Sequence, residues 1–121
     1  MVLEIPLFPC YVFVRTVLLP ANRIAVLCVS GVIAFVGMRG RGTPIPDRQI
    51  EDLRSVISHR LAADPYPFLN VGQRVRVRGG CLEGVEGILI AKDGDRRLVV
   101  SVNAIEKSIA ISLAGYDVEP A

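Results

Sequence analysis

The sequence predicts an α+β protein, and two periodicities carry that prediction. Apolar residues recur every three or four positions in one segment, as in an amphipathic helix. In the second half of the chain they alternate with polar residues, as in half-buried β-strands. The composition, 51% hydrophobic and 21% charged, is typical of a folded globular chain, and 121 residues provide one ordinary domain or two very small ones.

Two apolar runs near the amino end predict interior strands. Residues 7–14 are rich in β-branched and aromatic side chains, and residues 23–29 are apolar on both faces. The connection between them contains Pro20 and Asn22, which favour a change of direction. We therefore expect two antiparallel neighbours, followed by a loop at residues 37–42, where three of six residues are glycine.

Residues 47–62 form the one clear helix that the sequence predicts. Asp47 is a suitable N-cap because its carboxylate accepts hydrogen bonds from the first free backbone N–H groups. Pro65 and Pro67 follow the helix and favour an extended connection. The apolar stripe of the helix consists of Ile50, Leu53, Ile57 and Leu61.

The last part of the chain predicts a small β-barrel. Val75 and Val77 alternate with arginines, and further short apolar runs follow with turn-forming residues between them. Closure into a barrel removes the exposed edges that so short a sheet presents. The later strands are expected at residues 85–91, 98–102 and 109–113.

The charge is unevenly distributed along the chain. The net charge of +2 is too small to indicate a nucleic-acid partner by itself. Residues 1–62 carry seven basic and four acidic side chains, whereas residues 63–121 carry seven basic and eight acidic ones. Any polyanion is therefore expected to meet the first half of the chain.

Cysteine and histidine usage argues against a reactive or metal-binding site. Three cysteines without CxxC spacing and a single histidine, His59, disfavour zinc. Cys10, Cys28 and Cys81 suit a reducing cytoplasm, where we expect them to be small buried residues. No acid/base pair or phosphate-binding loop is recognisable, so we expect no catalytic residue, cofactor or metal. No apolar run reaches the ~20 residues that a membrane span needs, so we expect no membrane anchor.

Four segments, taken in order, resemble the NusG family of transcription elongation factors. They are PLFPCYVFVR at 6–15, SGVIAFVG at 30–37, PIPDRQIEDL at 44–53 and VGQRVRVRGGCLEGVEGILI at 71–90. The last segment resembles a KOW motif, and its glycine positions are Gly72, Gly80, Gly84 and Gly87.

The resemblance implies an NGN-type antiparallel sheet followed by an SH3-like KOW barrel. The expected bounds are 1–62 for the NGN-like domain, 63–70 for a linker and 71–121 for the barrel. The family's first domain opens with a Trp-containing strand and a helix, but here five residues precede Pro6 and there is no Trp. We expect a truncated sheet, in a fragment or a natural truncation, whose uncovered apolar face promotes homo-oligomers.

The resemblance also implies a function that involves no enzyme activity. Family members dock a hydrophobic patch on the clamp helices of RNA polymerase and suppress pausing or termination, and their KOW barrel recruits a termination factor or a ribosomal protein. In this sequence the patch corresponds to Phe8, Pro9, Tyr11, Phe13 and Phe35. The alternative is that these rings fill the domain's own core.

Arginines supply the candidate nucleic-acid contacts. Arg39 and Arg41 lie in the glycine-rich loop, where they are expected either to reach upstream or non-template DNA or to be solvated. Arg23 corresponds to a position where some family members contact the polymerase lobe opposite the clamp, and it is the third candidate. The arginines Arg74, Arg76 and Arg78 form a basic stripe that is expected to bind RNA or an acidic protein surface, or to remain a solvated strand face, with Glu83, Glu86, Asp93 and Asp95 nearby.

Two other functions remain open at the level of sequence. A ribosome-associated or general RNA-binding KOW protein is one, because the barrel does not determine the function. An inactive truncated paralogue is the other.

Overall fold

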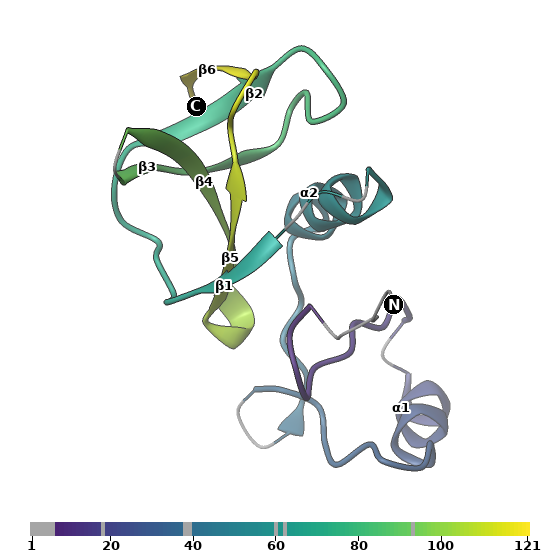
Figure 1. The fold of residues 1–121 in the computed structure, drawn as a ribbon. Helices are drawn as coiled ribbons and strands as arrows, with labels where there is room; N and C mark the ends of the chain where they lie inside the picture. The colour runs from purple at the N-terminus through teal and green to yellow at the C-terminus, as the bar shows by residue number, and fades with distance from the viewer. Residues whose placement is uncertain (1–6, 18, 38–39, 60, 62, 93) are drawn as a thin grey trace, which may run out of the picture. The chain divides into compact units, whose positions relative to one another are not determined.

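The chain folds as two compact units, unit 1 (Met1–Thr43) and unit 2 (Pro44–Ala121). The structure is a computed structural model, drawn in Figure 1. It describes residues 7–17, 19–37, 40–59, 61, 63–92 and 94–121. No helix in these described ranges is both long and apolar enough to cross a membrane.

Unit 1 contains the helix α1 (Pro20–Leu27), where the sequence predicts a strand. The strand prediction for residues 23–29 is therefore wrong. Pro20 occupies the first helical turn, where its fixed φ suits a helix and its missing N–H costs nothing. Leu19 precedes it in an extended conformation. The two-sided apolar character of this run cannot distinguish a short helix from a strand.

The strand predicted at residues 7–14 is also absent. The backbone instead turns at its start, where the Tyr11 N–H donates to the Phe8 carbonyl at 3.2 Å. No β-strand occurs among the described residues of unit 1, and the expected truncated antiparallel sheet is not seen in them. The physical reason is the missing partner: the run that was expected to pair with it is α1, and a strand needs a neighbour for its backbone hydrogen bonds.

Unit 2 begins with α2 (Asp47–Ser58), which confirms the one helix that the sequence predicts. It ends at Ser58 rather than at residue 62, and its N-cap is Pro46 instead of Asp47. Asp47 lies in the first turn, where its charge favours the positive end of the helix dipole.

Six antiparallel strands form one sheet in unit 2, ordered β1-β5-β4-β3-β2-β6. Together with the helices they confirm the α+β class. The short 3-10 helix η2 (Asn103–Ile105) connects β4 and β5. The strands are β1 (Ala63–Tyr66), β2 (Arg74–Arg78), β3 (Glu86–Lys92), β4 (Asp95–Val102), β5 (Lys107–Ser112) and β6 (Asp117–Pro120).

Strand alternation places the core of unit 2 on one face of β2. Val75 and Val77 are buried, and Arg74 and Arg78 are exposed, as the period of two predicts. Buried side chains from the other strands and from the β2–β3 connection complete this core. They include Leu82, Val85, Ile88, Leu98, Val99, Val100, Ile109, Ile111 and Leu113.

The compact units divide the chain earlier than the expected domain bounds. The predicted linker, residues 63–70, contains β1, which pairs with β5 through the register Ala63 to Ile111. Pro65 is tolerated in β1 because β1 is an edge strand and Pro has no N–H to donate to a second neighbour. Helix α2 also belongs to unit 2.

Candidate functional site

Phe8 and Phe13 contact each other in unit 1. Their ring centroids lie 6.3 Å apart and their planes meet at 89°, which is the favourable edge-to-face arrangement. Phe8 is only 4% exposed, whereas Phe13 is 37% exposed. Phe13 therefore offers part of its ring to solvent, and Phe8 supports that ring from inside the unit.

The other three residues of the predicted patch are partly or fully accessible. Pro9 is exposed, and Tyr11 and Phe35 are half-buried. Tyr11 and Phe13 fall within the strand predicted at residues 7–14, but they belong to no strand in the structure. What brings Phe13 to Phe8 is the turn at Pro9 and Cys10.

Cys10 occupies a backbone conformation that favours glycine. Its φ is +72°, which costs an ordinary side chain about 1–2 kcal/mol. Cys10 therefore introduces strain in the turn that supports the aromatic pair.

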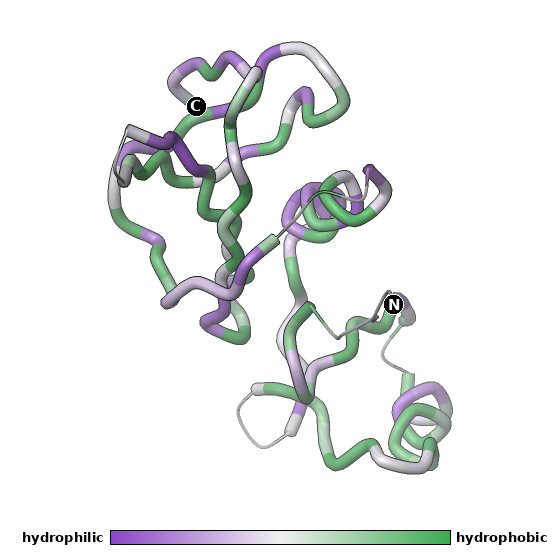
Figure 2. Tube along the Cα trace, viewed as in Figure 1, coloured by the Kyte–Doolittle hydropathy of each residue, from purple (hydrophilic) through white to green (hydrophobic). Residues whose placement is uncertain are grey.

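Other apolar side chains of unit 1 are widely exposed. Figure 2 shows that hydrophobic residues dominate the described part of unit 1. Val12 is 87% exposed and Ile33 is 95% exposed. Exposed apolar surface on this scale is typical of an interaction site. Other members of this exposed set are Val14, Val17, Leu19, Ile24, Leu27, Val29, Val32 and Val36.

Arg23 of α1 is engaged within unit 1. Its Nη1 donates to the carbonyl of Arg41 at 2.5 Å, and its Nη2 donates to the carbonyl of Gly40 at 2.9 Å. Its Cζ lies 4.9 Å from the centroid of the Phe35 ring. The structure thus brings together Arg23, Phe35 and the second half of the glycine-rich loop.

The glycine-rich loop contains two further arginines, Arg39 and Arg41. Arg41 is exposed, and only its backbone carbonyl is used by Arg23. Arg39, which was expected to contact DNA, lies outside the described residues.

The four glycines of the KOW-like motif lie in the β2–β3 region, and two have clear steric reasons. A Cβ on Gly87 of β3 would lie 2.4 Å from the backbone oxygen of Val99. Gly80 has a φ of +74° in the turn after β2, a conformation that glycine adopts without strain. The other two, Gly72 and Gly84, also have positive φ.

Acidic neighbours pair with two arginines of the basic stripe on β2. Arg76 Nη2 lies 2.8 Å from Glu86 Oε1, and Arg78 Nε lies 3.7 Å from Glu119 Oε2. Of the four acidic residues expected near the stripe, Glu86 therefore does pair with it. Glu119 was not anticipated, because only the structure shows that β6 pairs with β2.

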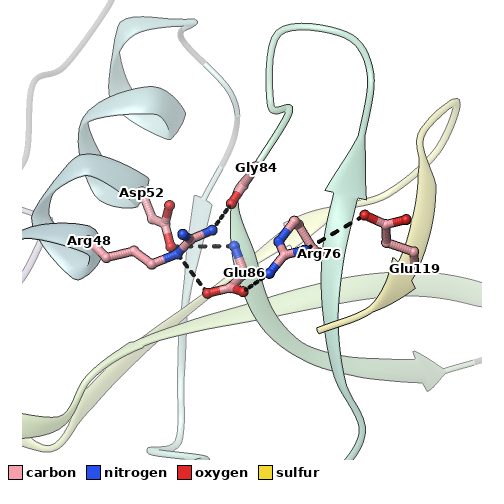
Figure 3. Close-up of polar contacts among 6 residues, drawn as sticks. All are labelled: Arg48, Asp52, Arg76, Gly84, Glu86 and Glu119. Carbon is pink, nitrogen blue, oxygen red and sulfur yellow. Dashed lines mark hydrogen bonds and ion pairs between the residues drawn. The ribbon is translucent and has the colours of Figure 1, made fainter.

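A polar cluster joins α2 to the sheet within unit 2 (Figure 3). Arg48 Nε lies 2.6 Å from Glu86 Oε2, and Arg48 Nη2 donates to the Gly84 carbonyl at 2.6 Å. The Glu86 N–H donates to Asp52 Oδ2 at 3.3 Å. Burial raises the pKa of the Asp52 carboxyl, against the opposing effects of the Glu86 N–H and of Arg48. No sequence pattern indicates this cluster, because its contacts join residues more than 30 positions apart.

The cysteines are free but exposed, so their expected burial is wrong. Cys81 Sγ lies 2.9 Å from Tyr116 Oη. This hydrogen bond, with smaller effects of desolvation and of the Cys81 charge, raises the pKa of Tyr116. Cys81 is thus a polar contact of the turn after β2 rather than a small apolar core residue.

Comparison with known proteins bears directly on unit 1. Residues 2–54 match the family model "NusG: Transcription termination factor nusG". This match contains the aromatic pair, Arg23, Phe35 and the first turns of α2.

A relative that matches most of the chain is the Transcription termination/antitermination protein NusG of Borreliella burgdorferi. It is 30% identical over 101 residues, which are 78% of this chain and 54% of the relative. The chain thus spans about half the length of that relative. No solved structure matches the chain. The family-model match and this relative confirm the resemblance that the sequence motifs indicated, and they place the chain in a NusG-like family.

Proposed function

We propose that the chain is a transcription elongation and antitermination factor that docks on the clamp helices of RNA polymerase and suppresses pausing or termination. In this proposal residues 1–62 act as the NGN-like part and residues 71–121 as the KOW part, acting in the cytoplasm. The chain contributes binding surfaces rather than a reactive group. Membership of the NusG-like family supports the general activity, and the aromatic surface of unit 1 supports the mode of docking.

The observation that carries the proposal is the exposed Phe13 ring backed by the buried Phe8. A ring supported from behind loses little conformational entropy when it enters a pocket on a partner. Partly exposed aromatic side chains of this kind commonly dominate the affinity of an interface. Other exposed residues of unit 1, such as Val12 and Ile33, supply apolar area that a helical partner would cover.

Charge supports a nucleic-acid contact close to this surface. Residues 1–43 carry four arginines and a single acidic residue, Glu4. Arg41 is exposed, and its guanidinium is suited to a phosphate. We propose that it lies near upstream or non-template DNA when unit 1 is on the polymerase.

Unit 2 is proposed to recruit a further partner, a termination factor or a ribosomal protein. The pairing of Arg76 and Arg78 with Glu86 and Glu119 weakens any attraction of β2 for phosphates. This disfavours the alternative of a general RNA-binding protein. A protein surface is the better partner for a strand face whose charges are already paired.

Retention on core RNA polymerase tests the proposal directly. Polymerase beads are incubated with the wild-type chain, Phe13→Ala and Val71→Ala, where Val71 is an exposed apolar residue of unit 2 that serves as the control. We expect Phe13→Ala to be lost and the control retained, with little change between about 0.1 and 0.5 M salt, because apolar docking is not screened. Equal retention of all three, or a steep loss with salt for every variant, would refute docking through Phe13.

A pause assay then separates docking from activity. The wild-type chain should shorten pauses of the elongating polymerase, and Phe13→Ala should not at the same concentration. A chain that binds but leaves pausing unchanged would point to an inactive paralogue. Sedimentation of both proteins tests the proposed homo-oligomer, which requires a concentration-dependent mass.

A further inference from the structure

Arg23 makes three side-chain contacts within unit 1 that the proposed function leaves unexplained. Its side chain starts on α1 and reaches two consecutive carbonyls, those of Gly40 and Arg41. The same guanidinium lies over the ring of Phe35. Both Nη groups of Arg23 therefore donate hydrogen bonds, and the flat face of its guanidinium contacts an aromatic ring.

These contacts suit a guanidinium and no other cation. The planar fork presents parallel N–H groups at a fixed spacing, and its weakly hydrated face stacks on aromatic rings. A lysine ammonium keeps the charge but is a point donor on a flexible stem. The site is thus specific for arginine in shape as well as in charge.

The segment that Arg23 holds has little else to order it. Gly40 and Gly42 have positive φ values of 65° and 92°, and neither has a side chain that packs. Fixing a backbone residue costs about 1–2 kcal/mol, so such a segment needs compensating contacts. Further support comes from the Gly40 N–H, which donates to the Gly37 carbonyl at 3.1 Å, and from the Thr43 hydroxyl, which donates to the Val36 carbonyl at 3.2 Å.

We propose that Arg23 is a positioning residue, which fixes Phe35 and residues 40–43 in one arrangement so that the aromatic surface and the Arg41 cation are presented together. Arg23 acts through Arg41 and Phe35 and makes no direct contact with nucleic acid in this assignment. This inference rests on the proposed function only in taking RNA polymerase and its DNA as the partner. The order that Arg23 imposes on residues 40–43 is independent of that partner.

Amide hydrogen exchange of the free, full-length chain tests the positioning itself. We expect Arg23→Lys to accelerate exchange of the Gly40 N–H, which donates to the Gly37 carbonyl, by about tenfold, because the forked contact is lost while the charge remains. Arg15→Lys is the matched control, since Arg15 is an exposed arginine of the same unit. Unchanged exchange in Arg23→Lys, with α1 still protected, would overturn the proposal.

A double-mutant cycle tests whether Arg23 acts through Arg41. Affinity is measured for a polymerase elongation complex assembled on DNA, for the wild type, Arg23→Lys, Arg41→Ala and the double variant. We expect Arg23→Lys to weaken binding by about threefold to tenfold in the wild-type background and by less in the Arg41→Ala background, where only the part of the effect that acts through Phe35 remains. Equal losses in both backgrounds would overturn the proposal that Arg23 positions Arg41. If the wild type fails to bind the complex, the proposed function fails, and the exchange experiment still decides the role of Arg23.

Discussion

Arg48 of α2 and Glu86 of β3 form an ion pair with 2.6 Å between Nε and Oε2, and the second oxygen of the same carboxylate lies 2.8 Å from Arg76 Nη2. One partly buried carboxylate therefore links a helix to two strands of unit 2. The family match ends at residue 54, within α2, and the helix packs in unit 2. Glu86 anchors the helix there together with the buried side chains of Leu53 and Val56.

Glu86→Gln is expected to lower the free energy of unfolding of unit 2 by about 1 kcal/mol. The substitution removes the charge that both arginines share, and charge-assisted hydrogen bonds are worth more than neutral ones. Urea unfolding followed by circular dichroism measures the change. Glu83→Gln, at an exposed position of the preceding turn, is the control. The interpretation fails if Glu86→Gln and Glu83→Gln lose equal stability, because only Glu86 pairs with the two arginines.

Cys10→Gly is expected to stabilise unit 1 by about 0.5–1 kcal/mol. Glycine removes the cost of the +72° φ, and part of that gain is offset by the greater entropy of the unfolded chain. Thermal unfolding provides the measurement. Cys10→Ala separates backbone strain from thiol chemistry, because alanine keeps the strain. A comparable gain with alanine would show that the thiol, and not φ, is responsible.

Asp52→Asn is expected to stabilise the protein at neutral pH. Because burial raises the pKa of Asp52 above its ordinary value of 3.8, the folded state binds more protons than the unfolded state between 3.8 and the raised value. The contribution of the Asp52 carboxyl to the free energy of unfolding is therefore largest below pH 3.8, where the carboxyl is protonated in both states. This contribution is lost as the pH rises through the raised pKa of the folded state. The asparagine oxygen can still accept from the Glu86 N–H. Unfolding curves measured from pH 3 to 8 should converge for the two proteins at the acid end, and parallel curves would contradict the assignment.

Gly87→Ala is expected to destabilise unit 2 by about 2–3 kcal/mol. The added Cβ would meet the Val99 carbonyl oxygen at 2.4 Å and the Leu98 side chain at 3.0 Å, so paired strands must separate. Gly79→Ala is a useful comparison because its Cβ meets open space and only the +71° φ is strained. Chemical denaturation should show a clearly larger loss of unfolding free energy for Gly87→Ala than for Gly79→Ala. Equal losses in the two variants would contradict the explanation by a clash of the Gly87 Cβ.

The sequence predicted the second half of the fold better than the first. The alternation around Val75 and Val77 correctly identified β2, since only a strand with one buried face produces it. Helix α2 was predicted from its period, and it ended four residues early. The edge strand β1 was missed because Pro65 is typical of linkers, and only the pairing with β5 shows that an edge can accept it.

Unit 1 and the polar cluster show what one-dimensional patterns leave undetermined. Residues 23–29 are apolar on every side, and such a run gives no periodicity by which to choose a helix over a strand. The predicted patch residues did include the contacting pair Phe8 and Phe13, although burial of Phe8 required coordinates. The engagement of Arg23 and the link between Arg48 and Glu86 depend on tertiary contacts across 17 to 38 residues, and no local spacing encodes them.

The dissociation constant for an isolated clamp-helix fragment of RNA polymerase tests the central claim most directly. Titration calorimetry compares the wild-type chain with Phe13→Ala, Tyr11→Ala and the exposed control Val71→Ala. If the supported ring of Phe13 anchors the complex, its removal raises the constant by about tenfold or more, and the control leaves it unchanged. An identical constant for Phe13→Ala and the wild type would contradict the account.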